Sequence, residues 1–480
     1  MDLDDTQCYR AVRAHDSRFD GRFFVGVRTT RIYCRPVCTA RTPLKHNCRF
    51  FPSAAAAEVQ GFRPCLRCRP ELAPGYAVVD ANQRLARSAA NLIEDGRLQD
   101  ANLAELARTL DVTDRHLRRV FQQEFGVSPV EYAQTQRLLL AKRLLTDTDL
   151  TVLDVAMASG FASLRRFNDL FRTRYRMTPG ELRRTTPSRE PTGRLTFDLA
   201  FRPPYDWEAM LAFLGRRAIA GVEQIDGRRY RRTMRVAGAG GKEATGWIEV
   251  APSPRRSALR IHASASLAGA VPTVLARAKC LFDLACHPDQ VAAALGPLGE
   301  AHPGLRLAGS VDGFEIAVRA ILGQQVTVAA ATTIAGRFAR AFGTAIVTPF
   351  AGLDHVFPRA GEIAVLEPGD IAKHGVIAAR ARAIIALAKA IDSGALRLDP
   401  AAPVEATLAA LEALPGIGPW TAHYIAMRAL AWPDAFPHPD VAVIKAIGEK
   451  PRAALAASEQ WRPWRAYAVL HLWKSLEKKP

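Results

Sequence analysis

The stretch Leu414-Pro-Gly-Ile-Gly-Pro-Trp-Thr-Ala422 decides how this chain is interpreted, because it places a glycine-rich turn between two helical stretches. Backbone N–H groups exposed in such a turn, at the start of a helix, can hold a DNA phosphate without reading base sequence. Gly416 and Gly418 are therefore candidate DNA-binding residues. The alternative is a common tight turn between two helices, which the hairpin alone does not exclude.

A proline-rich loop, Phe436-Pro-His-Pro-Asp440, follows the hairpin and can project a single carboxylate into a cleft. A fixed carboxylate in a water-poor cleft can stabilise a positive charge that develops in a reaction, or orient an attacking water. Asp440 is thus the candidate catalytic residue. It is also placed to cap the helix VAVIKAIG, and the two roles are compatible because a cap fixes the side chain.

Hairpin and loop together resemble the helix-hairpin-helix glycosylase superfamily. Further segments are similar to 3-methyladenine DNA glycosylase II of the AlkA type, namely PPYDW at 203–207, LFDLACHP at 281–288, HPGLRLAGSVDGFEIAVRAILGQQV at 302–326 and WRPWRAYAVLHLW at 461–473. The resemblance implies a TATA-box-binding-protein-like β subdomain at 195–270 and a helical catalytic domain at 271–480. The strand expected at 195–202 alternates apolar and polar residues, which indicates one buried face.

By the same resemblance, Trp420, Tyr424 and Trp473 form an aromatic pocket. Taken singly, each is more simply a core aromatic. In a pocket, stacking and cation–π attraction would favour an electron-poor flipped base, such as 3-methyladenine or a related cationic purine.

This chain differs from other members of the superfamily at several positions, and these differences limit the reaction and the substrates that we expect. Trp420 replaces the lysine of glycosylase/lyases, so no Schiff-base step is expected and excision should leave an abasic site. A four-cysteine cluster does not follow Asp440, so no iron-sulfur cluster is expected. Gln325 stands where the family usually has the Leu that wedges into the gap left by the flipped base, and Gln can hydrogen-bond the orphaned base. Val441 stands where one well-known member has Tyr.

Two short-spaced cysteine pairs near the N-terminus, Cys34-Arg-Pro-Val-Cys38 and Cys65-Leu-Arg-Cys68, predict a tetrahedral Zn²⁺ site. A domain at 1–80 would need this metal because its core is small. A purely structural zinc site is one interpretation. Arginines crowd the ligands, however, and would offset the charge of four thiolates; they are Arg31, Arg35, Arg41, Arg63, Arg67 and Arg69.

RTTRIYCRPVCTAR followed by GFRPCLRCRPE closely resembles the N-terminal domain of the Ada adaptive-response family, which takes methyl groups from DNA phosphotriesters. The resemblance implies that Cys34 is the methyl acceptor and that Cys38, Cys65 and Cys68 complete the zinc set. Methylation would remove a negative charge facing a polyanion, so we hypothesise that it strengthens DNA binding. The Pro-Cys-His-Arg motif of this family is missing, so repair of O6-methylguanine is not expected.

An internal repeat fills the expected helical domain at 84–184: LAELARTLDVTDRHLRRVFQQEFG and VLDVAMASGFASLRRFNDLFRTRY each fit a helix-turn-helix. The second copy is similar to the signature end of AraC-type transcription regulators. A helical bundle with solvated arginines is the alternative, and the presence of two copies argues against it. The candidate DNA contacts are Arg115, Arg118, Arg119, Arg165, Arg166 and Asn168.

The 480 residues exceed one hydrophobic core, and 65 Lys and Arg against 47 Asp and Glu give a net charge of +18. An Arg-rich enzyme without nucleic acid would share this charge. No signal peptide or bilayer-spanning run is found, so a cytoplasmic protein without a membrane partner is expected. The Pro-, Ser- and Thr-rich residues 185–194 are interpreted as a linker. The fold class is multidomain α+β.

The leading hypothesis is an Ada–AlkA fusion that binds one zinc ion and repairs alkylated DNA. It would act on double-stranded and alkylated DNA, bind promoter DNA and have RNA polymerase as a candidate partner. The alternative is a transcription regulator whose C-terminal part binds DNA but is catalytically inactive. In a third interpretation, the N-terminal half merely targets an enzyme to DNA.

Overall fold

The structure, a computed structural model, describes residues 4–15, 23–51, 54–68, 70, 81–94, 96, 98, 103–148, 150–184, 194–237, 243–254, 256–438 and 440–477. The chain divides into two compact units, Met1–Ala90 with Ala107–Pro129 and Asn91–Leu106 with Val130–Pro480. Of the expected linker 185–194, only Arg194 is described. None of the helices among the described residues is long and apolar enough to cross a membrane.

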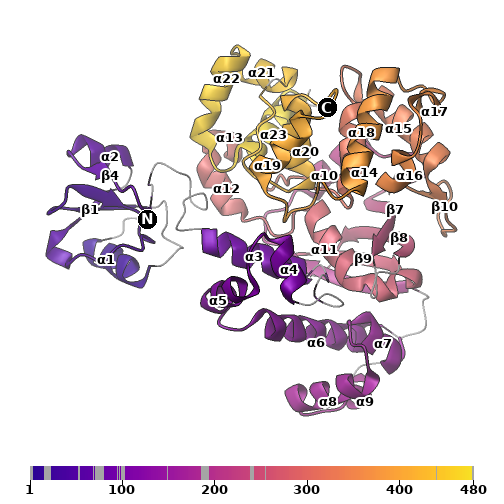
Figure 1. Cartoon of the computed structure of the whole chain (residues 1–480), viewed down its shortest axis with the longest axis horizontal. Helices are drawn as coiled ribbons and strands as arrows, with labels where there is room; N and C mark the ends of the chain where they lie inside the picture. Colours follow the sequence, from indigo (N-terminus) through magenta and orange to yellow (C-terminus); the bar gives the residue numbers. More distant parts are fainter. Residues whose placement is uncertain are drawn as a thin grey trace. The chain divides into compact units, whose positions relative to one another are not determined.

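The N-terminal cysteines lie on and around a small four-stranded sheet of order β3-β1-β2-β4 (Figure 1). Its elements are α1 (Asp5–Ala14), β1 (Phe24–Val27), β2 (Ile32–Cys34), a 3-10 turn at Lys45–Asn47, β3 (Cys48–Phe51), α2 (Ala54–Val59) and β4 (Arg63–Pro64). Strand β1 runs antiparallel to β2 and β3, and β4 runs parallel to β2. Gly26 in β1 allows close packing, because a Cβ there would lie 2.6 Å from the ring of Phe51.

Between residues 81 and 184, the described residues contain helices and no strands, as the repeat predicts. The helices are α3 (Ala81–Glu94), α4 (Leu103–Thr109), α5 (Asp114–Phe125), α6 (Pro129–Asp147), α7 (Val152–Ala158), α8 (Leu164–Tyr175) and α9 (Pro179–Arg184). Thr113 caps α5 by accepting from the N–H of His116, and Ser163 caps α8 by accepting from the N–H of Arg166. The equivalent helices of the two repeat copies therefore begin in the same way.

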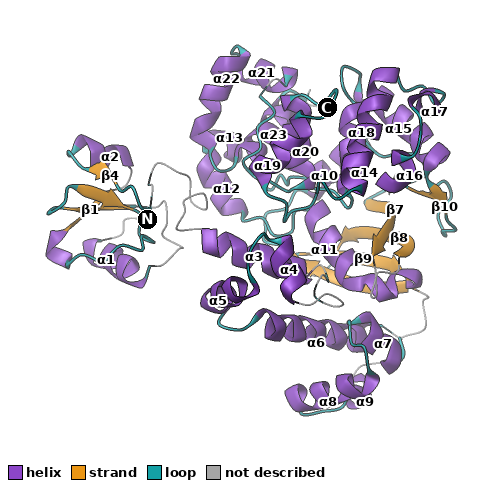
Figure 2. Cartoon of the chain, in the orientation of Figure 1, coloured by secondary structure: helices purple, strands orange, loops and turns teal. Residues whose placement is uncertain are grey.

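A five-stranded antiparallel sheet of order β5-β9-β8-β7-β6 follows (Figure 2). Its strands are β5 (Arg194–Ala200), β6 (Glu223–Asp226), β7 (Arg229–Ala237), β8 (Glu243–Pro252) and β9 (Ala258–Ser264). The expected alternation is confirmed, because Leu195, Phe197 and Leu199 are buried; Phe201 lies beyond the end of β5 and is half-buried. Helix α10 (Trp207–Gly215) packs its buried Trp207 and Met210 into the same core.

The chain is expected to be helical from residue 271, and the described residues from 265 onward form helices and loops with one two-stranded ladder, β10 (Thr344–Ala345) with β11 (His355–Val356). The helices are η5 (Ala265–Ala270), α11 (Val271–Leu281), α12 (Pro288–Leu295), α13 (Pro297–Glu300), α14 (Gly313–Leu322), α15 (Val328–Phe342), α16 (Ala360–Ala364), α17 (Pro368–Ala372), α18 (Ala378–Asp392), α19 (Val404–Glu412), α20 (Pro419–Ala429), α21 (Val441–Ile447), α22 (Pro451–Ala457), η6 (Ser458–Trp461) and α23 (Arg465–Ser475).

Helix α14 is the central element of this helical body. All of its residues except Arg319 are buried, and α15, α18 and α20 pack against it. A helix that is buried all round is a core helix, and its charged residues need partners within the protein. Glu315 and Arg319 on α14 have such partners in the larger sheet, Arg232 and Glu223. The expected fold class is confirmed by this arrangement of a small sheet, helix-turn-helix repeats, a larger sheet and a helical body.

Candidate active site and metal centre

Asp440 is the N-cap of α21, which confirms the expected cap. Its Oδ1 accepts from the N–H of Val443 at 2.9 Å and from Nε1 of Trp473 at 3.1 Å, and its Oδ2 accepts from Nε1 of Trp420 at 2.9 Å. Both carboxylate oxygens are thus held, by two indoles and by the start of a helix.

The proline-rich loop before Asp440 is anchored by Phe436, which is 1% exposed and packs on Val443 and Val469. The backbone N–H of Phe436 donates to Nδ1 of His423 at 3.3 Å. Burial lowers the pKa of His423 to about 4, so its ring is neutral and can accept this bond. Packing and hydrogen bonding together fix the direction in which Asp440 leaves the loop.

A cavity of about 370 Å³ opens beside Asp440, a volume in the range of small-molecule sites. The rings of Trp420 and Tyr424 stack with centroids 5.3 Å apart and an interplanar angle of 12°, and the ring of Trp473 lies 6.5 Å from that of Tyr424. These three aromatics and Asp440, all singled out from the sequence, line the same cavity. The other lining residues are Arg217, Arg319, Ala320, Gly323, Val326, Val328, Ala331, Thr332, Ala335, Ala442 and Leu476.

The hydroxyl of Tyr424 accepts from Nη1 of Arg428 at 2.8 Å. Burial alone would raise the pKa of Tyr424, but the nearby guanidiniums, Arg428 foremost, outweigh burial and lower it. The tyrosine is therefore surrounded by positive charge. Sequence reasoning did not single out any of these arginines.

The predicted hairpin joins α19 to α20, and both of its glycines are exposed. Gly416 has a φ of +77°, and a Cβ at this position would lie 3.2 Å from Cβ of Ala383. Gly418 is the N-cap of α20, and Pro419 occupies the first turn, where it needs no N–H partner. The hairpin thus presents free N–H groups at a helix start.

A second exposed loop, between α14 and α15, carries Gln325 with a φ of +53°. Its neighbour Gln324 donates through Nε2 to the carbonyl of Gly416 at 2.8 Å and to Oγ1 of Thr421 at 3.0 Å. These two bonds connect the loop to the hairpin. Gln325 itself does not line the cavity, although Gly323 and Val326 do. Val441 is 80% exposed beside Asp440.

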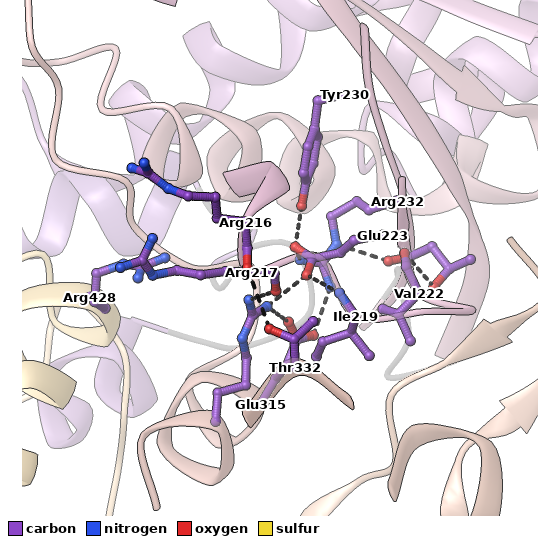
Figure 3. Close-up of polar contacts among 12 residues, drawn as sticks. Arg216, Arg217, Ile219, Val222, Glu223, Tyr230, Arg232, Glu315, Thr332 and Arg428 are labelled. Carbon is purple, nitrogen blue, oxygen red and sulfur yellow. Dashed lines mark hydrogen bonds and ion pairs between the residues drawn. The ribbon is translucent and has the colours of Figure 1, made fainter. Parts of the chain in front are cut away.

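A group of buried charged side chains includes Glu223, Arg232 and Glu315 (Figure 3). It adjoins the cavity, because Arg319 pairs with both glutamates and also lines the cavity. Glu223 on β6 accepts from Nη1 of Arg319 at 2.7 Å and from the hydroxyl of Tyr230. Glu315 accepts from Nη2 of Arg232 at 2.7 Å and from Nη1 of Arg319 at 3.2 Å. The group joins the larger sheet to α14. Its one sequence signal is the charged pair Glu315 and Arg319, four residues apart in an otherwise apolar segment.

In the first unit, Cys34, Cys38, Cys65 and Cys68 place their Sγ atoms within 4.8 Å of one another. Four buried thiols at this spacing fit a tetrahedral Zn²⁺. Cys34, Cys38 and Cys65 are 7–8% exposed and Cys68 is 0% exposed. The remaining four cysteines, Cys8, Cys48, Cys280 and Cys286, join no further group of metal ligands among the described residues.

The arginines around the cysteines divide into two kinds. Arg35 is 1% exposed, and its backbone N–H donates to Sγ of Cys68 at 3.4 Å. Arg31, Arg41, Arg63 and Arg67 are exposed, and Arg69 lies outside the described residues. One guanidinium therefore belongs to the core of the metal centre, while the exposed ones face solvent.

The candidate DNA contacts of the helix-turn-helix repeats lie on α5 and α8. Arg115, Arg118 and Arg119 on α5 are exposed, and so are Arg165 and Arg166 on α8, whereas Asn168 is half-buried. Arg118 pairs with Asp114 at 2.7 Å, and Nη2 of Arg119 lies 3.1 Å from Nδ1 of His116. Both helices thus present arginines to solvent.

Comparisons with known proteins agree with this arrangement. Family models match at residues 7–71 (metal binding domain of Ada), 106–185 (helix-turn-helix domain), 196–312 (AlkA N-terminal domain) and 318–449 (HhH-GPD superfamily base excision DNA repair protein). The last match begins within α14 and includes the hairpin and Asp440. The helical body therefore defines a member of the helix-hairpin-helix base excision class of DNA repair proteins.

The probable bifunctional transcriptional activator/DNA repair enzyme AlkA of Mycobacterium tuberculosis is 38% identical to this chain over an alignment of 494 positions that covers 99% of this chain and 97% of that protein. The chain belongs to this family of bifunctional AlkA proteins. DNA-3-methyladenine glycosylase 2 of Escherichia coli is 40% identical over 58% of this chain and 96% of its own length. The bifunctional transcriptional activator/DNA repair enzyme Ada of Escherichia coli is 39% identical over 30% of this chain and 38% of its own length.

Proposed function

We propose that residues 195–480 form a monofunctional DNA glycosylase that hydrolyses the N-glycosidic bond of alkylated bases, such as 3-methyladenine and related cationic purines. The observation that carries this proposal is the carboxylate of Asp440, held by Trp420, Trp473 and the start of α21 at the edge of an aromatic cavity. An exposed glycine hairpin supports it, since its N–H groups suit a phosphate.

In this mechanism, the damaged base is flipped into the cavity and stacks on Trp420 and Tyr424. As the bond to the sugar lengthens, positive charge develops on the sugar, and the fixed carboxylate of Asp440 stabilises it without reorganising. Water then adds to the sugar, and an abasic site remains. Trp420 occupies the position at which a lyase needs a lysine, so the reaction stops there.

The test is release of free base from an alkylated duplex by wild type and by Asp440→Asn. Asparagine still caps a helix, so α21 should persist while the charge is lost. We expect base release to fall at least about a hundredfold, the loss typical of removing one transition-state contact. The exposed Asp289→Asn is the matched control and should retain full activity. Absence of release by wild type would instead favour a regulator without catalysis.

The N-terminal domain, by the same proposal, holds one Zn²⁺ through Cys34, Cys38, Cys65 and Cys68 and repairs DNA methylphosphotriesters. Zinc, when bound, keeps thiols ionised at neutral pH. The Sγ of Cys34 attacks the methyl carbon, the carbon–oxygen bond breaks, and the phosphate leaves as a diester. The 8% exposure of Cys34 supports this assignment over Cys68, which has no exposed surface.

Mass spectrometry after incubation with methylated DNA tests this step. Wild type should gain one methyl group on the peptide that contains Cys34, and Cys34→Ser should gain none. A Cys34→Ser protein that is still methylated would overturn the assignment.

The helix-turn-helix repeats at 84–184 are proposed to bind promoter DNA, with base contacts from Arg115, Arg118, Arg119, Arg165, Arg166 and Asn168. Methylation of Cys34 would switch this binding on, and contact with RNA polymerase would then activate transcription. Gln325 is proposed to fill the gap left by the flipped base. The proposed domains are 1–80, 84–184, 195–270 and 271–480, with 185–194 as the linker.

A further inference from the structure

The cavity beside Asp440 has two arginines in its wall, and their electrostatic surroundings differ. Arg319 is neutralised by Glu223 and Glu315. Arg217, which follows α10, donates through Nη1 to the carbonyl of Phe213 at 3.2 Å. Within the described ranges, no carboxylate forms an ion pair with Arg217. An arginine without a counter-ion therefore faces the space where the base would bind.

Arg428, which lies near Arg217 beside the ring of Phe213, is also a cation. Arg428 is 2% exposed, donates to Tyr424 and to the carbonyl of Gly309, and forms no ion pair among the described residues. The guanidiniums of Arg217 and Arg428 lie 3.9 Å and 5.0 Å from the ring centroid of Phe213. Figure 3 shows Arg217 extending toward Arg428 and away from Glu223.

The balance of charge follows from these contacts. Four guanidiniums lie in this region, those of Arg217, Arg232, Arg319 and Arg428. Its two carboxylates, Glu223 and Glu315, each pair with both Arg232 and Arg319, which leaves Arg217 and Arg428 without an ion pair among the described residues. Burial and the neighbouring cations lower the pKa of Arg217, but a guanidinium stays protonated at neutral pH. This wall of the cavity is therefore positive.

A positive wall acts differently on two classes of damaged base. When the bond between the sugar and the base nitrogen breaks, its electron pair stays on the base. A base that was cationic leaves as a neutral molecule, whereas a base that was neutral leaves as an anion. The guanidinium attracts the developing anion and repels the cation, and these effects are strong in a cavity that excludes water.

We propose that Arg217 is a specificity-determining residue that favours neutral damaged bases, which depart as anions, over cationic alkylpurines. The inference rests on the proposed glycosylase activity and concerns the balance between its substrates: the aromatic rings attract cationic purines, and Arg217 offsets part of that preference in favour of neutral bases. Asp440 stabilises the positive sugar while Arg217 stabilises the negative base, so the two residues match the charge separation of a neutral substrate. Water adds to the sugar, its proton goes to the base, and Arg217 remains protonated throughout.

Two lesions test the proposal, hypoxanthine and 7-methylguanine, each in the same duplex. Both bases carry a carbonyl at position 6, and only 7-methylguanine is cationic; because 7-methylguanine also has an N7 methyl and a 2-amino group, the effect of charge is taken from the comparison of the two Arg217 variants. Single-turnover base release would be measured at subsaturating enzyme for wild type, Arg217→Met, Arg217→Lys and Arg216→Met. Methionine keeps the apolar stem, lysine keeps the charge, and Arg216 is an exposed neighbour paired with Glu477.

We expect the ratio of hypoxanthine release to 7-methylguanine release to fall about tenfold in Arg217→Met, which is within the effect of one unit charge a few ångströms away at an effective dielectric constant near 20. The ratio should be largely retained in Arg217→Lys and unchanged in Arg216→Met. Equal loss for both lesions in Arg217→Met would overturn the proposal, since it would show a structural role. Release of 7-methylguanine but not of hypoxanthine by wild type would overturn it as well. Release of neither base by wild type would refute the glycosylase activity itself.

Discussion

Replacing Glu223 by Gln should destabilise the glycosylase part of this chain by about 3 kcal/mol. Glu223 is 6% exposed and accepts from Arg319 at 2.7 Å, from the backbone N–H of Ile219 at 3.1 Å and from Tyr230. Removing one partner of a buried ion pair costs about 3–5 kcal/mol, because the other charge stays buried without compensation. Arg319 and Arg232 both keep Glu315, so we expect the lower end of this range.

Tryptophan fluorescence during urea unfolding measures this effect selectively, because all seven tryptophans lie between Trp207 and Trp473. The matched control is Glu208→Gln. Glu208 pairs with Arg228, the two side chains are 65% and 70% exposed, and such a surface pair contributes less than about 1 kcal/mol. If Glu223→Gln loses no more stability than Glu208→Gln, the reasoning on buried charge is wrong.

The stability lost in Glu223→Gln should depend on pH. Burial alone would raise the pKa of Glu223, but Arg319 and Arg232 outweigh burial and lower it. A carboxyl whose folded pKa is lowered contributes stability above its unfolded pKa, about 4.3, and loses that stability as pH falls through the folded pKa. The difference between wild type and Glu223→Gln should therefore be full at pH 7 and should shrink below about pH 4.

Four further predictions concern other parts of the molecule. Gly416→Ala should cost about 1 kcal/mol of stability and weaken binding to any duplex, because the φ of Gly416 is +77° and a Cβ would meet Ala383. Gly418→Ala should keep its stability, because Gly418 has a φ of −97° and open space where the Cβ would lie. Equal unfolding midpoints for the two variants would contradict this prediction. Burial raises the pKa of Asp283 to about 6, so the contribution of Asp283 to stability is present below pH 4 and is lost as pH rises to about 6. Asp283→Asn can still accept from Tyr467 and Leu307, so it should be about 2–3 kcal/mol more stable than wild type at pH 7.5 and similarly stable at pH 4. Parallel pH profiles of stability for the two proteins would refute this prediction. Chelation of zinc should expose residues 4–68 to proteolysis without changing the tryptophan unfolding curve. Methylation of Cys34 should tighten DNA binding by an amount that shrinks with added salt. Equal DNA affinity of the methylated and unmethylated proteins would exclude the electrostatic switch.

Sequence reasoning located Asp440, the hairpin and the four clustered cysteines because each is carried by a short local pattern. Glycine and proline mark the turns, and cysteine pairs at close spacing have few other uses. The helix caps at Thr113 and Asp440 were predictable for the same reason. Polar residues directly before an apolar helical stretch have a local role that does not depend on the rest of the fold.

The positive wall of the cavity could not be predicted in this way. Arg217 and Arg319 lie 102 positions apart, and the chain holds 65 Lys and Arg residues among which neither is distinctive. Their effect depends on which carboxylates reach them, and that is a property of tertiary packing. Arg35 shows the same limit, since six arginines near the cysteines look equivalent in sequence although one of them is buried with the ligands.

The two hydrogen bonds of Gln324 also bear on how the enzyme would search a genome. They tie the loop that carries Gln325 to the hairpin that would hold the DNA backbone. If the hairpin holds a phosphate, these bonds also set the distance between that phosphate contact and the base pair that Gln325 reaches. Because phosphate contacts weaken as ionic strength rises, added salt should then weaken both contacts together.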